Sequence, residues 1–244
     1  MKLVHLGAIS TGLVIAFGIA MVVPAFTRTP NYTPPLIVML SFSVTDYDNS
    51  DDWCNNLSSI FKKYGVKATV FVTGKVADQY PECVTTFSNN IDIGSQTYSY
   101  VDLPSVPDYT AQLEEVRNGK QAVDYAGKLY SRIFKAPYES TDQNIYSLLT
   151  RSDIAADFSY HDQYNKYYNG QFIRFDLAVY EGNNHSADFF HSLTVSETPI
   201  LINFDNSTPV EQIDRFISEL KSGNVRFVNA SEVTGIDLTV REGE

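Results

Sequence analysis

The chain has 244 residues, of which 43% are hydrophobic and 19% are charged. This is the composition of a globular protein, so disordered, collagen-like and coiled-coil chains are excluded, and the length fits one domain better than two. Acidic residues outnumber basic residues 29 to 18, which gives a formal charge of −11. A surface with this charge argues against nucleic acid as a partner, but it would tolerate cationic polymers such as partly deacetylated amino sugars.

The first feature along the chain is residues 6–26, which carry no charged side chain and are long enough to cross a bilayer. Small residues at 23–25 would also suit a signal peptidase. Residues 1–27 are therefore predicted to be a signal anchor or, as the alternative, a cleaved signal peptide, and residues 28–35 a Pro-rich tether. As an anchor, this segment makes a single-pass protein of the cell membrane, and with either alternative the bulk of the chain is expected to lie outside the cytoplasm.

Hydrophobic patterning then predicts alternating strands and helices. In chain order these are strand 35–43, helix 53–64, strand 68–73, helix 76–87 (with Pro81 early in it or breaking it), strand 91–94, helix 109–127, strand 131–134, helix 141–151, strands 154–158 and 171–175, helix 186–193, strand 199–204, helix 210–221 and strand 225–227. The long strands are mainly apolar, and the pattern is that of strands buried on both faces. The pattern predicts an α/β fold with a parallel sheet, open or closed into a barrel.

Two further features agree with export. The two cysteines, Cys54 and Cys83, are expected to form a disulfide in an oxidising compartment. Candidate glycosylation sequons occur at Asn31, Asn56, Asn184, Asn206 and Asn229.

Common catalytic signatures, such as a phosphate-binding loop or a nucleophile elbow, are absent. One acidic cluster, Asp46, Asp48, Asp51 and Asp52, follows the first predicted strand. Its carboxylates could bind a hard cation, or they could form a solvated turn that caps the next helix. The spacing of His185 and His191 does not place both rings on one helical face, so these histidines and His161 are expected to be surface residues.

The order of several segments resembles the polysaccharide deacetylase (NodB-homology) family. The run Lys62-Lys-Tyr-Gly-Val-Lys-Ala-Thr-Val-Phe71, preceded by the apolar strand 37–42, is similar to the start of that family. Residues 91–103, the segment Phe134-Lys-Ala-Pro-Tyr138 and residues 200–205 follow where the later motifs fall. The resemblance covers almost all of residues 36–240, and it implies a distorted (β/α) barrel of about seven strands.

The resemblance also implies chemistry. Enzymes of this family remove acetyl groups with a divalent metal held by one Asp and two His, a second Asp as general base and a late His as general acid. This chain departs from the pattern at nearly every such position. The replaced positions are Ser43 and Val44 for the two Asp, Gln96 and Tyr100 for the metal His, Lys135 for the Arg that orients the base, and Asn203 or Phe204 for the late His. Asp46 is a possible substitute carboxylate.

From these departures the sequence predicts a degenerate member that binds or acts on a carbohydrate or cell-envelope glycan without metal-dependent deacetylase activity and without a cofactor. Substrate contacts are expected from Tyr98, Tyr100, Pro137 and Tyr138 near the ancestral cleft. Ser43, Val44, Gln96 and Tyr100 are expected to converge there. One alternative is an active hydrolase of carbon–nitrogen bonds with a rearranged site, using Asp46 or Asp48, His161 and a divalent metal such as zinc. Another is a protein-binding subunit of an envelope complex.

Overall fold

The computed structural model describes residues 34–45, 50–159, 166–168, 172–174, 177–193 and 198–241. The described residues belong to one compact unit, Pro34–Glu244. Within them, no helix is both long enough and apolar enough to cross a membrane. The predicted membrane segment, residues 6–26, lies outside the described residues.

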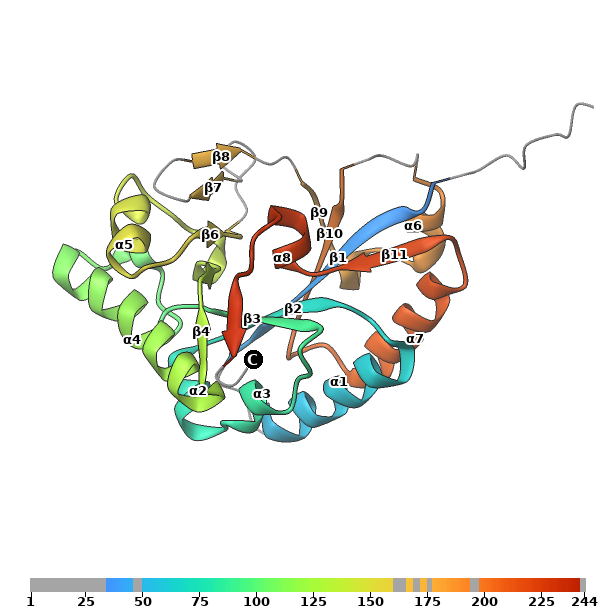
Figure 1. Cartoon of the computed structure of the whole chain (residues 1–244), viewed down its shortest axis with the longest axis horizontal. Helices are drawn as coiled ribbons and strands as arrows, with labels where there is room; N and C mark the ends of the chain where they lie inside the picture. Colours follow the sequence, from blue (N-terminus) through green and yellow to red (C-terminus); the bar gives the residue numbers. More distant parts are fainter. Residues whose placement is uncertain are drawn as a thin grey trace, which may run out of the picture. The chain divides into compact units, whose positions relative to one another are not determined.

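Seven parallel strands within the described residues form the centre of the molecule, in the spatial order β6-β5-β3-β2-β1-β10-β9. Their bounds are β1 (Leu36–Val44), β2 (Ala68–Val72), β3 (Ile91–Ser95), β5 (Ile133–Phe134), β6 (Ala156–Asp157), β9 (Ala178–Glu181) and β10 (Ile200–Asp205). The sheet curves, and most of the helices follow its outer side (Figure 1). This is the predicted (β/α) barrel.

Shorter strands complete the sheet. β11 (Val225–Val228) pairs in parallel with the first half of β1, and β7 (Lys166–Tyr168) and β8 (Phe172–Arg174) add an antiparallel hairpin beside β6. β4 (Leu129–Ser131) and β12 (Thr239–Arg241) form a separate antiparallel pair. The carboxyl ends of β1, β5, β9 and β10 point the same way, so residues at these ends can meet.

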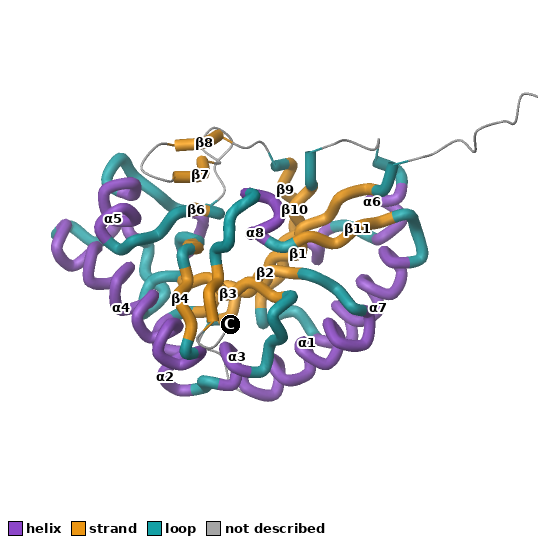
Figure 2. Tube along the Cα trace, in the orientation of Figure 1, coloured by secondary structure: helices purple, strands orange, loops and turns teal. Residues whose placement is uncertain are grey.

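The helices are α1 (Ser50–Tyr64), α2 (Gly74–Gln79), α3 (Glu82–Thr85), α4 (Tyr109–Gly127), α5 (Ile145–Arg151), α6 (Ala187–His191), α7 (Val210–Lys221) and α8 (Ala230–Thr234), with single 3₁₀ turns η1 (Leu103–Ser105), η2 (Pro137–Glu139) and η3 (Gly182–Asn184). Figure 2 shows α1, α2, α3, α4 and α7 on the outer side of the strands, whereas α8 lies on the inner side, where Ala230 and Val233 pack into the cluster that contains Met39. Helices α4 and α7 have the predicted bounds. The helix predicted at 76–87 is two helices, α2 and α3, separated at Tyr80 and Pro81.

The two faces of β1 contact different cores. Val38, Leu40, Phe42 and Val44 alternate along the strand and pack into the cluster beneath the helices. Met39 lies on the opposite face, in a cluster that includes residues of β2, β5, β6 and β10. Because side chains alternate along a strand, Ser41 and Ser43 share the face of Met39. This alternation decides which residues at the end of β1 reach the barrel interior.

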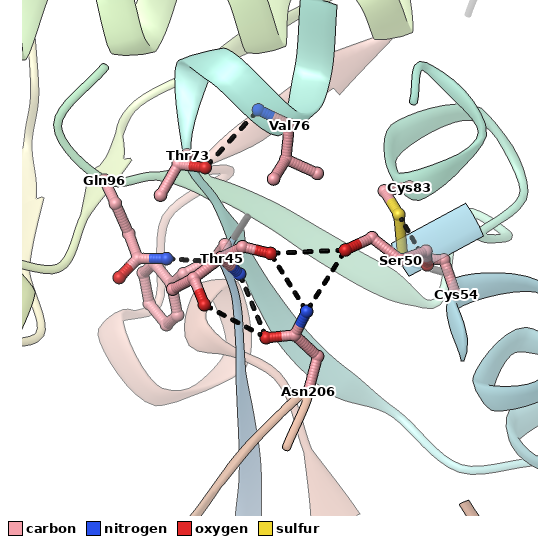
Figure 3. Close-up of a disulfide and its surroundings, with 9 residues drawn as sticks. Thr45, Ser50, Cys54, Thr73, Val76, Cys83, Gln96 and Asn206 are labelled. Carbon is pink, nitrogen blue, oxygen red and sulfur yellow. Dashed lines mark hydrogen bonds between the residues drawn. A yellow bond between two sulfur atoms is a disulfide. The ribbon is translucent and has the colours of Figure 1, made fainter. Parts of the chain in front are cut away.

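The predicted disulfide is present. Cys54 in α1 and Cys83 in α3 are bonded, with a Cα–Cα distance of 5.1 Å (Figure 3). Both cysteines are fully buried, and the bond closes a loop with a sequence separation of 29. In the chain-entropy model such a crosslink stabilises the fold by about 3 kcal/mol.

Candidate functional site

A chain of hydrogen-bonded polar side chains joins the carboxyl ends of four strands; three of its members are buried, and Glu181 at its end is exposed. The Nζ of Lys135, the residue after β5, donates hydrogen bonds to Ser43 Oγ of β1 at 3.0 Å and to Asn203 Oδ1 of β10 at 2.7 Å. The Asn203 amide nitrogen in turn donates to Glu181 Oε1, at the end of β9, at 3.2 Å. We call these four residues the lysine cluster.

Lys135 is the charged centre of this cluster, and its side chain is buried. Burial lowers the pKa of Lys135 to about 8, while the carboxylates of Glu139, Glu181 and Asp205 oppose that shift. Burial also raises the pKa of Glu139, which the lysine charge partly offsets. Near neutral pH the lysine is therefore a cation close to three carboxyl groups.

A buried carboxyl group, that of Asp157, lies next to the lysine cluster in the sheet. Asp157 of β6 pairs with Phe134, the residue before Lys135. Its Oδ1 accepts hydrogen bonds from the backbone nitrogen and hydroxyl of Ser159, at 2.9 and 2.5 Å. Burial raises the pKa of Asp157 to about 6, and the two bonds from Ser159 oppose the shift.

Sequence reasoning did not identify Glu181, Glu139, Asp157 or Asp205 as part of the site. Glu181 ends strand β9, which was not predicted because it follows a polar, Tyr-rich stretch. The short apolar run Leu177-Ala-Val-Tyr180, with its β-branched and aromatic residues, is the signal that would have indicated it.

Val44 lies on the wrong face for the predicted convergence. Strand β1 continues through Val44, so its side chain packs into the core beneath the helices, whereas the Ser43 hydroxyl faces Lys135. The prediction that Ser43 and Val44 both line one pocket is therefore corrected. Side-chain alternation along an unbroken strand is the physical reason.

Gln96 follows β3, and its side chain is tied to a neighbouring strand. Its amide nitrogen donates to the backbone carbonyl of Phe71, in β2, at 3.2 Å, and the residue is only 1% exposed. The backbone carbonyl oxygen of Gln96 lies so close to Gly119 that a Cβ there would come within 2.3 Å of it. Gln96 is therefore held from both sides, as a structural residue would be.

Tyr100 and Tyr138 form an aromatic pair, with ring centroids 4.9 Å apart at an interplanar angle of 53°. Both have left-handed backbones, with φ of 59° and 56°, and Glu139 follows with φ of 54°. Such conformations cost energy for residues other than glycine and occur preferentially at functional sites. Tyr138 is 65% exposed beside the buried Pro137, so the pair presents an aromatic surface to solvent.

Tyr98, expected near this pair, has its side chain elsewhere. Its hydroxyl donates to Asp78 Oδ2 of α2 at 3.0 Å, and its ring packs against Gly74 at the start of that helix. The segment from Gln96 to Tyr100 thus sends Tyr98 toward the outer helices and Tyr100 toward Tyr138.

The open choice between Asn203 and Phe204 is resolved. Asn203 belongs to the lysine cluster, whereas Phe204 stacks on Phe42 with centroids 5.5 Å apart and packs edge-on against Phe216. Asn203 therefore occupies the site position, and Phe204 belongs to the core.

The acidic cluster after β1 is described only in part. Asp51 and Asp52 lie in the first turn of α1, where carboxylates interact favourably with the helix dipole. Asp46, Asp48 and His161 lie outside the described residues.

The two described histidines each contact a neighbouring group: His185 stacks on Phe189 and His191 contacts the Leu220 carbonyl. Within the part of the chain that the structure describes, no group of three His, Cys, Asp or Glu side chains could hold a metal ion.

The side chain of Asn206, which follows β10, is hydrogen bonded to the residue after β1 and to the first residue of α1 (Figure 3). Its Oδ1 accepts from the Thr45 backbone nitrogen at 3.1 Å, and its Nδ2 donates to the Thr45 carbonyl at 2.9 Å and to Ser50 Oγ at 3.3 Å. The amide therefore holds the end of β1 against the start of α1.

The glycosylation candidates differ in accessibility. Asn56 on α1 and Asn184 in η3 are exposed, whereas Asn229 is buried and caps α8 by accepting from the Glu232 backbone nitrogen. Asn206 uses its amide nitrogen in the contacts above, and Asn31 lies outside the described residues. Asn56 and Asn184 are the described candidates whose side chains face solvent.

Comparison with known proteins identifies the family. The family model for polysaccharide deacetylase matches residues 31–156, which is just over half of the chain. The chain belongs to the polysaccharide deacetylase family. A search of curated proteins gives no match.

Solved structures of this family share the fold. A peptidoglycan deacetylase from Bacillus subtilis is 14% identical, with a TM-score of 0.60 over 83% of this chain and 91% of that one. A peptidoglycan N-acetylglucosamine deacetylase in complex with a hydroxamate-type compound is 19% identical, with a TM-score of 0.61 over 85% and 91%. A CE4 family pseudoenzyme from Bacillus anthracis is 12% identical, with a TM-score of 0.58 over 82% and 66%.

The described residues at the family's metal positions do not fit a metal ion. Val44 packs in the core, Gln96 binds a backbone carbonyl through its amide nitrogen, and the Tyr100 ring packs beside Tyr138. Zinc prefers imidazole, thiolate and carboxylate ligands. The Lys135 ammonium, 3.0 Å from Ser43, adds a positive charge that would repel a cation.

Proposed function

We propose that this family member binds a cell-envelope carbohydrate at the carboxyl end of its barrel and does not catalyse metal-dependent deacetylation. The single observation that carries the proposal is the lysine cluster. An ammonium group is hydrogen bonded to Ser43 and Asn203, at the positions where the family has its base and its late histidine. Neither side chain can exchange a proton near neutral pH, so general acid–base catalysis has no partner at these positions.

The aromatic pair supports carbohydrate binding. Tyr100 and Tyr138 sit in strained backbone conformations, and Tyr138 remains 65% exposed. An exposed ring supplies a large contact area with a polar tip, which suits the apolar face and hydroxyl edge of a pyranose. Other proteins with this fold are described as peptidoglycan deacetylases or as a pseudoenzyme, so both loss of activity and a glycan ligand have precedents among them.

The experiment measures acetate release and zinc content together. The full chain is purified in a detergent without a sugar headgroup and incubated with chitotetraose (four N-acetylglucosamine units) with and without added zinc. We expect no acetate release and no stoichiometric zinc. Stoichiometric zinc that a chelator removes together with a hydrolase activity would contradict the proposal. If Asp46→Asn then abolished that activity, the rearranged metal site would replace it.

Binding is tested separately with Tyr138→Ala. Loss of the exposed ring should weaken chitotetraose binding about tenfold in calorimetry, the size expected for one aromatic contact. Tyr130→Ala is the matched control, because Tyr130 is a 41% exposed tyrosine on β4 that contacts Lys120 instead. No binding by the unaltered chain, or equal binding by both variants, would count against a carbohydrate site at this end of the barrel.

A further inference from the structure

A second polar surface lies on the outer side of the barrel, away from the lysine cluster. It is an open pocket of about 560 Å³ between α2 and α4. Its lining residues are Asp78, Tyr98, Asn118, Gln121, Ala122 and Tyr125. We call this the α2–α4 surface. It shares no residue with the lysine cluster or with the pair of Tyr100 and Tyr138.

Helix α4 presents one face to this pocket. Asn118, Gln121 and Tyr125 are spaced three and four residues apart, so they lie on the same side of the helix. Tyr125 is 88% exposed, the largest exposed fraction among the large hydrophobic side chains that the structure describes. Neither Asn118 nor Gln121 has a side-chain hydrogen bond within the described residues, so both amides are available to a ligand.

The floor of the surface is held rigidly. Besides its hydroxyl bond to Asp78, Tyr98 donates its backbone nitrogen to the Glu115 carbonyl of α4 at 2.9 Å. Its carbonyl accepts from the Lys75 backbone nitrogen of α2 at the same distance. A Cβ on Gly74 would lie 2.4 Å from the Tyr98 ring. The close approach of these backbones fixes the aromatic and acidic groups before any ligand arrives, which lowers the entropic cost of binding.

The chemistry of the surface selects the kind of ligand. Two tyrosine rings offer stacking area, two amides offer paired donors and acceptors for vicinal hydroxyl groups, and the Asp78 carboxylate offers a negative charge. The pocket volume lies within the usual range for small-ligand sites. A protein or lipid partner would instead be expected to meet a contiguous apolar patch, which these residues do not form.

We propose that the α2–α4 surface is a second carbohydrate-binding site, which takes an oligosaccharide of amino sugars with free amino groups. Tyr125 would stack on a pyranose ring, Asn118 and Gln121 would bind its hydroxyl groups, and Asp78 would pair with an ammonium group. The net charge of −11 on the chain favours such a cationic sugar over an anionic one. The proposal does not depend on the site at the carboxyl ends of the strands, because the two surfaces share no residue.

The test is a titration of the full chain, labelled at asparagine and glutamine side chains, with the tetramer of glucosamine. Proton–nitrogen spectra should show shifts of the Asn118 and Gln121 amide signals, assigned through Asn118→Ser and Gln121→Ser. Tyr125→Ala should weaken this binding about tenfold, as expected for one lost aromatic contact. Tyr130→Ala is again the control and should leave it unchanged. Unshifted amide signals, or equal binding by the Tyr125 and Tyr130 variants, would overturn the proposal.

Two comparisons identify the charge requirement and separate this site from the first one. Chitotetraose, which lacks free amino groups, should bind the α2–α4 surface more weakly than the glucosamine tetramer, and Asp78→Asn should remove that difference. Equal affinity for the two sugars in the unaltered chain would contradict the role of Asp78. Tyr138→Ala should leave the Asn118 and Gln121 shifts intact, so a failure of the first site cannot be mistaken for a failure of the second.

Discussion

At the scale of single residues, Lys135 carries the most unusual chemistry. A buried lysine that donates to neutral oxygens is less costly when it loses its proton, which is why burial lowers its pKa from 10.5 to about 8. Below pH 8 the residue is protonated in both the folded and the unfolded state, and folding bears the full cost of burying the charge. Between pH 8 and 10.5 the unfolded state binds more protons, so stability attributable to this group rises with pH.

This rise of stability with pH gives the first prediction. Relative to Lys135→Met, which has no titratable group, the unaltered chain should gain free energy of unfolding between pH 7 and pH 10. The shift corresponds to about 3 kcal/mol as an upper bound. Chemical denaturation of both proteins at several pH values measures the difference, and the titration of other lysines and tyrosines cancels in it. A difference that stays constant with pH would show that Lys135 titrates normally.

The second prediction concerns Asn206. Asn206→Ala removes the hydrogen bonds to Thr45 and Ser50, and although Ser50 Oγ still donates to the Thr45 carbonyl at 3.3 Å, the Thr45 backbone nitrogen loses its bond to the amide, which should lower the free energy of unfolding by about 2 kcal/mol. Asn184→Ala, at an exposed sequon asparagine, is the control and should have almost no effect.

The same contacts predict where a glycan can be attached. If the protein is glycosylated, mass spectrometry of its peptides should find the glycan on Asn184 and not on Asn206. A glycan on Asn206 in the folded protein would contradict the structural role given to its amide.

At the scale of elements, the unbroken strand β1 decides which of two adjacent positions can accept an aspartate. Ser43 and Val44 are adjacent, but one faces Lys135 and the other the core beneath the helices. Ser43→Asp should cost less than about 1.5 kcal/mol, because the new carboxylate lies beside the lysine ammonium. Val44→Asp should cost more than about 3 kcal/mol, because it buries a charge among apolar side chains. Denaturation midpoints of the two variants give the comparison, and similar losses would mean that β1 does not run straight through Val44.

Three features of the structure illustrate what the sequence could predict and what it could not: the helices α4 and α7, the strand β9, and the directions of the Val44 and Tyr98 side chains. Long periodic elements such as α4 and α7 were predicted with the right bounds, because their apolar stripes are continuous over several turns. The short strand β9 was not predicted, and its Glu181 was therefore missed. Which side of the barrel Val44 and Tyr98 face depends on where each strand ends, and that is set by pairing with distant strands and not by local pattern. The positions of the family motifs were thus predictable, but the direction of individual side chains was not.

At the scale of the whole molecule, the chain has the architecture of the deacetylase family, and we propose that the chemistry at the barrel end differs. The sheet and its helices depend on apolar burial, which tolerates many sequences of similar pattern. The site depends on a few charged and imidazole side chains, and replacing them leaves the core intact. This separation explains how a chain under 20% identical to solved family members keeps their fold with Lys135, Ser43 and Asn203 at the site.

The last prediction concerns where the molecule is attached. Residues 6–26 are apolar, and the tether of residues 28–35 would hold the barrel close to a membrane surface. We propose that the full chain stays with the membrane fraction after cell breakage and resists extraction by high salt, which releases proteins bound only by charge. A variant that begins at Pro34, behind its own cleaved export signal, should be recovered in soluble form with an unchanged disulfide and melting temperature. Recovery of the full chain from the cytosol would refute the attachment, whereas a mature N-terminus near Phe26 would indicate a cleaved signal peptide.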